Sequence, residues 1–488
     1  MRNPRTKRRS ARVFSSNKRK ITAAVAGISA LALTLSACSS TSSTSSSSTS
    51  AASTSAAASG SAAASGSAGA EATGDFCTQI KQLWPDDMTG KTVDYYTTVS
   101  TPEDQIWQTS FKPFEDCTGA KIQWESSKSF ETDIKVRIDS GNPPDIAAFP
   151  QPGLLSSIVS SSGAVKKPPQ AVADNVDKYY SAQEKAYGTV NGIFFAPPLD
   201  ANVKSFVWYS PKAFAAAGYT VPTTFDELTA LSDKIAATGK KPWCAGIGSG
   251  DATGWPATDW LEDIVLRQSG PDVYEQWVNH QIPFNDPQIA SALAEVGKFL
   301  KNPQYVNGGF GDVATIASTA FGDGGLPILK GDCFMHRQAN FYESFWPAGT
   351  NVAEDGDVYA FYLPTMSDEF GKPILGGGTF AGAFNDKPEV QAFQYYVTTP
   401  AWSDAYAAAG TNITGNKALD PSVIKSPIAK LSYAILQDPK AVFAFDASDR
   451  MPSEVGSGAE WKQLTAWIAQ NQDDATTLNN IEAAWPAG

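Results

Sequence analysis

The sequence predicts an α/β fold in which a parallel β-sheet is covered by helices. Residues 93–99, 121–124 and 145–149 have the composition of strands, and two stretches with helical spacing lie between them. This β-α-β-α-β order is typical of a parallel sheet with covering helices. The chain has 488 residues, of which 42% are hydrophobic and 18% charged, so it is long enough for two or three hydrophobic cores.

Each predicted element has a local cause. Residues 93–99 are rich in β-branched and aromatic side chains, which favour a strand. Thr101 is the expected N-cap of the first helix, with Pro102 in the first helical position, and Gly119 ends that helix. The second helix carries apolar residues on one face, and its predicted face is Phe130, Ile134 and Ile138.

Two later helices have clear start signals. Thr224 and Glu227 form a capping box before an apolar run, and Asp286-Pro287 opens another amphipathic stretch. No repeat of 20–50 residues is visible in the sequence.

The first 74 residues resemble an export signal followed by a tether. Residues 1–37 hold nine Lys or Arg, no acid, and an apolar run at 21–35 that is short for a membrane span. The run ends in Leu35-Ser36-Ala37-Cys38, which resembles the bacterial lipobox, so we expect Cys38 to carry the lipid; an ordinary secretory signal is the alternative. Residues 38–74 consist of this Cys and a Ser, Ala, Thr and Gly stretch with one charge, which predicts a disordered tether.

The charge balance excludes several functions. The chain has 38 Lys or Arg and 50 Asp or Glu; without residues 1–37 the basic count falls by nine, to 29, and the net charge is -21. Such an acidic surface repels nucleic-acid phosphates, so no nucleic-acid partner is expected. Only two histidines occur, which argues against a multi-histidine zinc site, and we expect no metal or cofactor.

Four cysteines follow Cys38, as suits an oxidising location. They allow three pairings. We favour Cys77–Cys117 and Cys244–Cys333, because each pair then stays within one neighbourhood of the chain.

Motifs for catalysis are weak. Gly90-Lys91-Thr92 resembles the end of a phosphate loop, but a strand and not a helix follows it. The stretch 246–250 has glycine where a nucleophile elbow needs serine. Carboxylates are plentiful, so their number alone leaves a glycosidase pair open.

Five stretches of the chain occur together in a recognisable order: 141–146 with 150–153, 204–211 with 222–228, 333–338, 376–380, and 446–452. No single one of these motifs is specific, but their order holds over most of the chain. From about residue 90 onward the chain thereby resembles the family 1 extracellular solute-binding proteins of ABC importers, and within them the group named for α-glucoside uptake.

The resemblance implies a type II periplasmic-binding-protein fold of two lobes with the ligand cleft between them. It implies crossings near 196–205 and 363–378. The corresponding domains are 75–200 for the first part of lobe 1, 201–370 for lobe 2, and 371–488 for segments that complete lobe 1 and for C-terminal helices at the cleft. The expected protein is a lipid-anchored monomer on the extracytoplasmic face of the cell membrane, which delivers a sugar to ABC permease subunits.

Sugar binding explains the polar and aromatic clusters of the sequence. Aromatic rings cover the apolar faces of a pyranose, and carboxylate, amide and guanidinium groups bond its hydroxyls. Each tryptophan could instead fill the core, and Asp449 could cap a helix. The predicted ligand-binding residues are Gln151, Trp255, Asp259, Trp260, Arg337, Gln338, Phe341, Trp346, Gly378, Thr379, Asp449, Arg450 and Trp461.

The sequence therefore predicts a sugar receptor that is not an enzyme. It captures a small, α-glucoside-like oligosaccharide by closing its lobes. The alternatives are a secreted glycoside hydrolase and a binding protein for a solute other than a sugar.

Overall fold

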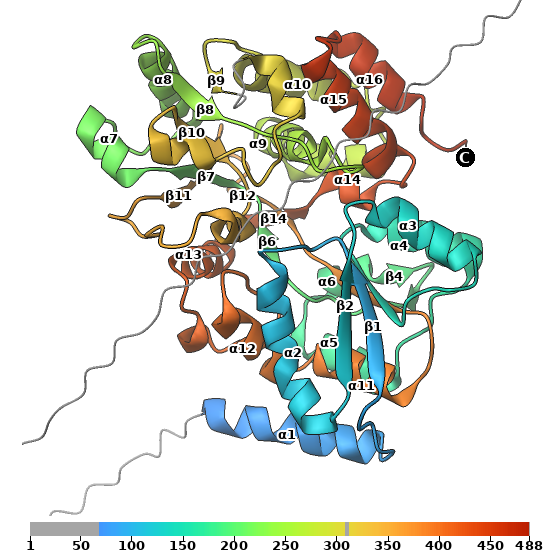
Figure 1. Cartoon of the computed structure of the whole chain (residues 1–488). Helices are drawn as coiled ribbons and strands as arrows, with labels where there is room; N and C mark the ends of the chain where they lie inside the picture. Colours follow the sequence, from blue (N-terminus) through green and yellow to red (C-terminus); the bar gives the residue numbers. More distant parts are fainter. Residues whose placement is uncertain (1–67, 308–311, 488) are drawn as a thin grey trace, which may run out of the picture. The chain divides into compact units, whose positions relative to one another are not determined.

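The predicted β-α-β-α-β order forms the first sheet of the computed structural model, which describes residues 68–307 and 312–487 (Figure 1). Strands β1, β2 and β3 are parallel, so the predicted α/β class is confirmed. A fourth strand, β13, joins β3 in the antiparallel direction from a distant part of the chain. The bounds are β1 Thr92–Thr97, α2 Asp104–Thr118, β2 Lys121–Ser126, α3 Phe130–Asp139, β3 Ile146–Phe149 and β13 Phe380–Ala383.

The described residues all belong to one compact unit, Gly66–Gly488. The predicted signal peptide and Cys38 lie outside them. Helix α1 (Ala68–Leu83) begins inside the range predicted as a tether, so the chain is helical before that range ends.

Helix α2 begins two residues later than predicted. Glu103, and not Thr101, occupies the N-cap position, and the Thr101 hydroxyl instead donates to Asp104 Oδ2 at 3.1 Å. Gly119 ends the helix as predicted, with a φ of 74° that favours glycine. The later start leaves Glu103 at the entrance of the helix, where its side chain lines the cavity described below.

The second sheet is mixed. Its strand order is β11-β7-β10-β8-β9, with β8 parallel to both of its neighbours and β7 antiparallel to both of its own. The bounds are β7 Phe206–Tyr209, β8 Lys241–Cys244, β9 Val306–Asn307, β10 Cys333–Arg337 and β11 Tyr359–Tyr362.

The two later helix starts are confirmed. The Thr224 hydroxyl accepts from the Glu227 amide at 3.2 Å, and the Glu227 carboxylate accepts in return, at the start of α8 (Phe225–Ala236). Asp286 caps α10 (Pro287–Leu300) by accepting from the amide of Gln288.

Three short strands connect the two larger sheets: β6 (Asn202–Val203), β12 (Lys372–Gly377) and β14 (Ala441–Phe445). Strand β12 pairs with β14 in parallel and with β6 in the antiparallel direction. Figure 1 shows them between the sheet of β1 and the sheet of β7. We call the regions around these two sheets lobe 1 and lobe 2, and β6, β12 and β14 the crossing strands. A third crossing strand, β14, was not predicted.

Separate hydrophobic cores fill the two lobes. Trp107, Phe393 and Trp402 lie in the main core of lobe 1, and Trp260, Trp277 and Trp467 in the main core of lobe 2. The last helices thus pack into lobe 2.

The remaining bounds are α4 Pro152–Ser162, α5 Gln170–Tyr179, α6 Ala182–Tyr187, β4 Thr189–Val190, β5 Ile193–Phe194, α7 Pro211–Ala217, α9 Trp255–Val278, α11 Pro388–Tyr396, α12 Pro400–Ala409, α13 Pro427–Leu436, α14 Ala447–Arg450, α15 Trp461–Ala469 and α16 Asp474–Glu482; short helical turns are η1 Val313–Ala317, η2 Leu326–Lys330, η3 Asn340–Phe345, η4 Pro421–Val423 and η5 Val455–Glu460.

None of the helices in the described part of the chain is both long enough and apolar enough to span a bilayer.

Both predicted disulfides are present. Cys77–Cys117 joins α1 to α2 in lobe 1, and Cys244–Cys333 joins β8 to β10 in lobe 2. Each bond therefore stays within one lobe.

We expect thiol counting on the denatured, unreduced protein to find none of these four cysteines free. The sequence separations are 40 and 89 residues, so each bond contributes about 4 to 4.6 kcal/mol on the chain-entropy model. The double substitution Cys244→Ser and Cys333→Ser should therefore lower the melting temperature. A labelled Cys244 or Cys333 in the wild-type protein would contradict this pairing.

Candidate ligand-binding site

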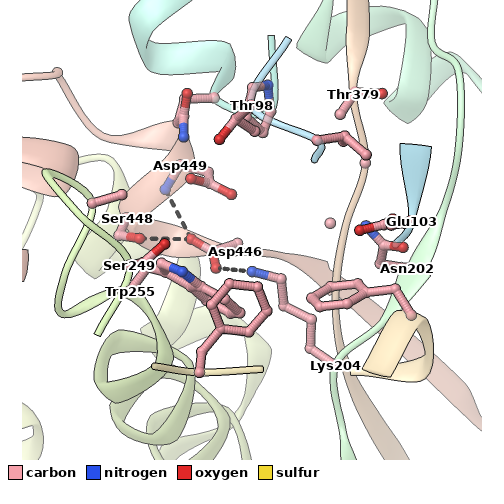
Figure 2. A pocket seen from close by; sticks show the side chains of 18 of the residues that line it. Thr98, Glu103, Asn202, Lys204, Ser249, Trp255, Thr379, Asp446, Ser448 and Asp449 are labelled. Atoms are coloured by element: carbon pink, nitrogen blue, oxygen red, sulfur yellow. Dashed lines mark hydrogen bonds and ion pairs between the residues drawn. The ribbon is translucent and has the colours of Figure 1, made fainter. Parts of the chain in front are cut away.

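A cavity of about 160 Å³ is lined by residues of both lobes and of the crossing strands (Figure 2). Its wall combines aromatic rings, carboxylates and backbone. The lining residues are Thr98, Val99, Ser100, Glu103, Lys128, Glu131, Pro150, Gln151, Asp200, Asn202, Lys204, Ser249, Ala252, Trp255, Phe321, Phe341, Phe345, Gly377, Gly378, Thr379, Asp446, Ser448, Asp449 and Trp461.

The aromatic part of the wall comes from lobe 2. Trp255 is the first residue of α9, and its ring centroid lies 5.1 Å from that of Phe321 and 6.2 Å from that of Phe341. Trp461 is the first residue of α15. At Gly254 the φ is 118°, and a Cβ would lie 2.2 Å from the Trp461 carbonyl oxygen, so only glycine lets the starts of the two helices meet.

A buried ion pair lies beside Trp255. Lys204 Nζ donates to Asp446 Oδ2 at 2.6 Å and to Asp259 Oδ1 at 3.0 Å, and it lies 5.5 Å from the centre of the Trp255 ring. Burial lowers the pKa of Lys204, but the attraction of Asp259 and Asp446 outweighs it and holds that pKa well above its usual value. The lysine is therefore charged, and it forms an ion pair with each of the two carboxylates.

Asp449 reaches the cavity from α14. The side chain of Asp446 caps this short helix by accepting from the Asp449 amide at 2.8 Å. The carboxylate of Glu262, on α9, accepts from the amides of Ala447 at 2.8 Å and Ser448 at 3.1 Å. Burial and the negative charge of Asp446 raise the pKa of Asp449 well above its usual value.

The face of α9 below the cavity is polar and fully buried. Asp259, Glu262, Asp263 and Arg267 are at most 1% exposed. Asp263 Oδ1 accepts from the Ser205 hydroxyl at 2.8 Å, next to β6. Arg267 donates to three backbone carbonyls on the path from β11 to β12, those of Leu363, Pro364 and Pro373. With the bonds of Glu262 to the start of α14, one helix thus bonds to residues in or next to all three crossing strands.

The opposite wall depends on Asp200. Its Oδ1 accepts from the Thr379 amide at 2.9 Å and from the Thr379 hydroxyl at 2.7 Å. A Cβ at Gly378 would lie 2.4 Å from the Asp200 carbonyl oxygen, so the close approach requires glycine. On the same side Gln151 Nε2 donates to Glu131 Oε1 at 3.0 Å, while Gln151 Oε1 is buried and has no hydrogen-bond partner among the residues that the structure describes.

The pKa of the Glu103 carboxyl group is strongly shifted by its surroundings in the wall. Asn412 Nδ2 donates to its Oε1 at 3.3 Å. Burial and the negative charge of Asp200 raise the pKa of Glu103 from 4.5 to about 8. The carboxyl group therefore holds its proton at neutral pH.

This shift predicts a pH dependence of stability. Between pH 4.5 and about 8 the folded protein keeps the Glu103 proton that the unfolded chain releases, so stability falls as the pH rises through this window. Glu103→Gln removes the titration, and its melting temperature should fall less than that of the wild-type protein between pH 5 and pH 8. Glu369→Gln, at an exposed position, is the control and should follow the wild type. Equal pH profiles for Glu103→Gln and wild type would contradict the shift.

Seven of the predicted ligand-binding residues line the cavity: Gln151, Trp255, Phe341, Gly378, Thr379, Asp449 and Trp461.

The other predicted residues lie behind the wall. Trp260 packs against Trp243 and Phe299 in the lobe 2 core, with ring centroids 5.2 and 5.6 Å away. Trp346 packs against Trp208, with ring centroids 5.7 Å apart.

The polar residues among them already have partners. Asp259 binds Lys204 and Arg337, and Arg337 also donates to Asp263 at 2.6 Å. Gln338 Oε1 accepts from the Ala339 amide at 2.8 Å. Arg450 donates to the carboxylate of Glu275, with Nη2 to Oε2 at 2.8 Å.

Several cavity residues were not predicted, among them Glu103, Glu131, Asp200 and Lys204. Asp200 and Lys204 lie within the predicted crossing at 196–205, so the crossing itself was the signal for them. Glu131 offers no such signal, because it is one acid among several on an amphipathic helix.

The part of the chain that the structure describes has no group of His, Cys, Asp or Glu side chains suited to hold a metal ion.

Comparison with known proteins agrees with this arrangement. The pattern that describes bacterial extracellular solute-binding proteins matches residues 98–323. The α-glucosides-binding periplasmic protein AglE of Rhizobium meliloti is 36% identical over 409 residues, which are 82% of this chain and 88% of AglE. The chain belongs to the bacterial extracellular solute-binding proteins. The osmoprotective compounds-binding protein GgtB of Synechocystis is 38% identical over 77% of this chain and 87% of its own.

Solved structures show the same fold at lower identity. The bacterial solute receptor AcbH has a TM-score of 0.67 at 17% identity, over 80% of this chain and 98% of its own. Maltose-bound MalE3 of T. maritima has a TM-score of 0.62 at 15% identity, over 81% and 98%. The expected periplasmic-binding-protein-like fold is thereby confirmed.

Proposed function

We propose that this solute-binding protein is the extracytoplasmic receptor of an ABC importer and captures a small, α-glucoside-like oligosaccharide. The cavity carries this proposal, because it combines aromatic rings such as Trp255 with carboxylates from both lobes. Rings of this kind cover the apolar faces of a pyranose, and carboxylates bond its hydroxyls. The name of AglE supports the same ligand class.

A ligand that touches both walls stabilises the closed form over the open form by its additional contacts there. Asp449 and Trp255 belong to the lobe 2 side, and Glu103 and Gln151 to the lobe 1 side. A permease that recognises the closed shape would then receive loaded protein in preference to empty protein. In this mechanism no bond of the sugar is broken.

A thermal-shift screen against glucose, maltose, trehalose, sucrose and raffinose tests the proposal. A ligand that binds only the native state raises the melting temperature by mass action, by an amount that grows with its concentration. We expect a rise with at least one disaccharide and none with amino acids or dipeptides. A rise with peptides alone, or with no sugar, would refute the proposal.

The same sugars distinguish a receptor from a glycoside hydrolase. The protein incubated with each disaccharide or with raffinose should return it intact, without release of monosaccharides. Steady release of monosaccharide would show an enzyme.

The proposed location is the outer face of the cell membrane, with the lipid on Cys38 and the folded lobes at the end of a Ser-rich tether. We expect Cys38→Ala to lose the acceptor thiol, so that the folded protein leaves the membrane fraction or stays unprocessed. Fractionation followed by mass spectrometry of the N-terminus measures both. A processed Cys38→Ala protein that stays in the membrane fraction would contradict the lipid anchor.

We propose that the protein acts as a monomer, which light scattering can test.

A further inference from the structure

The acidic and basic side chains that line the cavity are unequal in number. Five carboxyl groups face it: those of Glu103, Glu131, Asp200, Asp446 and Asp449. The lining also includes two lysines. Of these, Lys204 already binds two carboxylates, and Lys128 is exposed at the rim.

Asp449 is the carboxyl group with the fewest partners. Among the described residues no side chain or amide donates a hydrogen bond to its carboxylate, although the residue is only 9% exposed. Figure 2 shows the side chain above Asp446 and on the same side of the cavity as Trp255. Neither oxygen of this carboxyl group is among the fully buried atoms without a partner, so the group opens onto the cavity, where it can accept from a ligand that brings a donor.

Hydrogen-bond acceptors are also in excess elsewhere on the wall. Gln151 Oε1 and Asn202 Oδ1 are buried without a partner in the described part of the chain, and both residues line the cavity. Within residues 68–307 and 312–487, Glu131 receives a side-chain hydrogen bond only from Gln151. Phosphate, sulfate and carboxylate groups carry negative charge and offer acceptors, so they suit this wall poorly. An ammonium group offers three donors and a positive charge.

We propose that the cavity selects its ligand by charge: it rejects anionic glycosides and binds a glycoside whose amine meets Asp449 more tightly than the uncharged parent sugar. This inference rests on the proposed function, because it concerns the same cavity and names a narrower ligand class. The Trp255 ring adds to the preference, since the face of an aromatic ring attracts cations.

Proton release on ligand binding distinguishes an amino glycoside from an uncharged sugar. The charged groups around Asp449 are mainly negative, and burial together with Asp446 favours its protonated form in the free protein. An ammonium group that binds there displaces this proton into solution, whereas an uncharged sugar leaves it in place. The groups that act on Asp449 are Asp446, Lys204, Asp259, Glu131 and Glu460.

The test uses each of maltose, trehalose and sucrose that binds, its monoamino-deoxy derivatives, and its 6-phosphate. Calorimetry at pH 7 in two buffers of different ionisation enthalpy gives the affinity and the number of protons released. We expect at least one amino derivative to bind about ten-fold more tightly than its parent, with proton release, and the phosphate to bind at least about ten-fold more weakly.

The Asp449→Asn variant tests whether the preference for the amino derivative depends on Asp449. The ratio of amine to parent affinity should fall to about one, whatever happens to the absolute affinities. Asp272→Asn, at an exposed acid in the part of α9 that follows the break at Gly270, should keep the wild-type ratio.

The inference is overturned if no amino derivative exceeds its parent, if the phosphate binds as well as the parent, or if the ratio survives in Asp449→Asn. If no uncharged sugar binds at all, the proposed function fails instead, so the two failures are distinguishable.

Discussion

Trp255→Ala should weaken sugar binding at least about ten-fold, because a stacking tryptophan supplies an aromatic surface of about 150–250 Å². The ring lines the cavity next to Phe341 and is only partly buried, so its loss opens the wall and not the core. Asp449→Asn should weaken binding by about the same factor, since it replaces a carboxyl group that can both donate and accept at sugar hydroxyls, and a polar group left without its partner in a desolvated cleft costs about 1–3 kcal/mol. Calorimetry with a sugar identified in the thermal-shift screen measures both effects.

Trp485→Ala is the matched control for Trp255. Trp485 stacks on His280, with ring centroids 4.0 Å apart, and does not line the cavity. Its loss should lower the melting temperature and leave the affinity intact. If Trp255→Ala and Asp449→Asn both bind the sugar normally with unchanged far-UV spectra, the ligand site lies elsewhere in the protein.

Lys204→Met should destabilise the protein by about 3–5 kcal/mol, because it leaves Asp446 and Asp259 buried with one cation fewer. Asp259 retains Arg337 as a partner, whereas Asp446 retains only hydrogen bonds from Ser448 and the Asp449 amide. We therefore expect ligand affinity to fall as well, since Asp446 caps the helix that carries Asp449. Urea unfolding and calorimetry measure the two losses.

The double variant Lys204→Met with Asp446→Asn separates these effects. Removing the unpaired charge should restore part of the lost stability, while the affinity stays low because the cavity wall has lost both groups. Lys212→Met, at an exposed ion pair with Asp357, is the control and should change stability by less than about 1 kcal/mol. A Lys204→Met protein as stable as the wild type would contradict the role of this pair.

Most short-range signals in the sequence were reliable, although the N-cap signal at Thr101 was wrong. The glycine at the end of α2 and the capping box of α8 act through neighbouring residues, so the sequence contains all that determines them. The cysteine pairing was also predictable, because this choice pairs each cysteine with its neighbour in the order of cysteines along the chain.

The pairing of strands that lie far apart along the chain was harder to predict from the sequence. Strand β13 joins the first sheet beside β3, more than 200 residues away along the chain, and β14 joins the crossing strands. Neither position has a local signal, because a short apolar run fits several sheets equally well.

Within the candidate site, residue type alone did not separate the wall from the layer behind it. Trp255 and Trp260 lie five positions apart, so they point to different sides of α9: Trp255 lines the cavity and Trp260 fills the core. Likewise Asp446 faces the cavity and Asp259 lies behind it, yet both bind the same lysine. Which carboxylate faces the ligand depends on the fold and not on the spacing of acids along the chain.

Helix α9 reverses the usual pattern of tolerance to mutation. On most helices charged positions accept substitution readily, because they face water. Here Asp259, Glu262, Asp263 and Arg267 support the three crossing strands from inside the protein. A scan of all substitutions along α9 should therefore find these charged positions as sensitive as the leucines of the core, and the exposed Asp272 permissive. We expect sequences that diverge within this family to keep these four charged residues even where their ligand preference changes, because the four support the crossing strands and do not line the cavity.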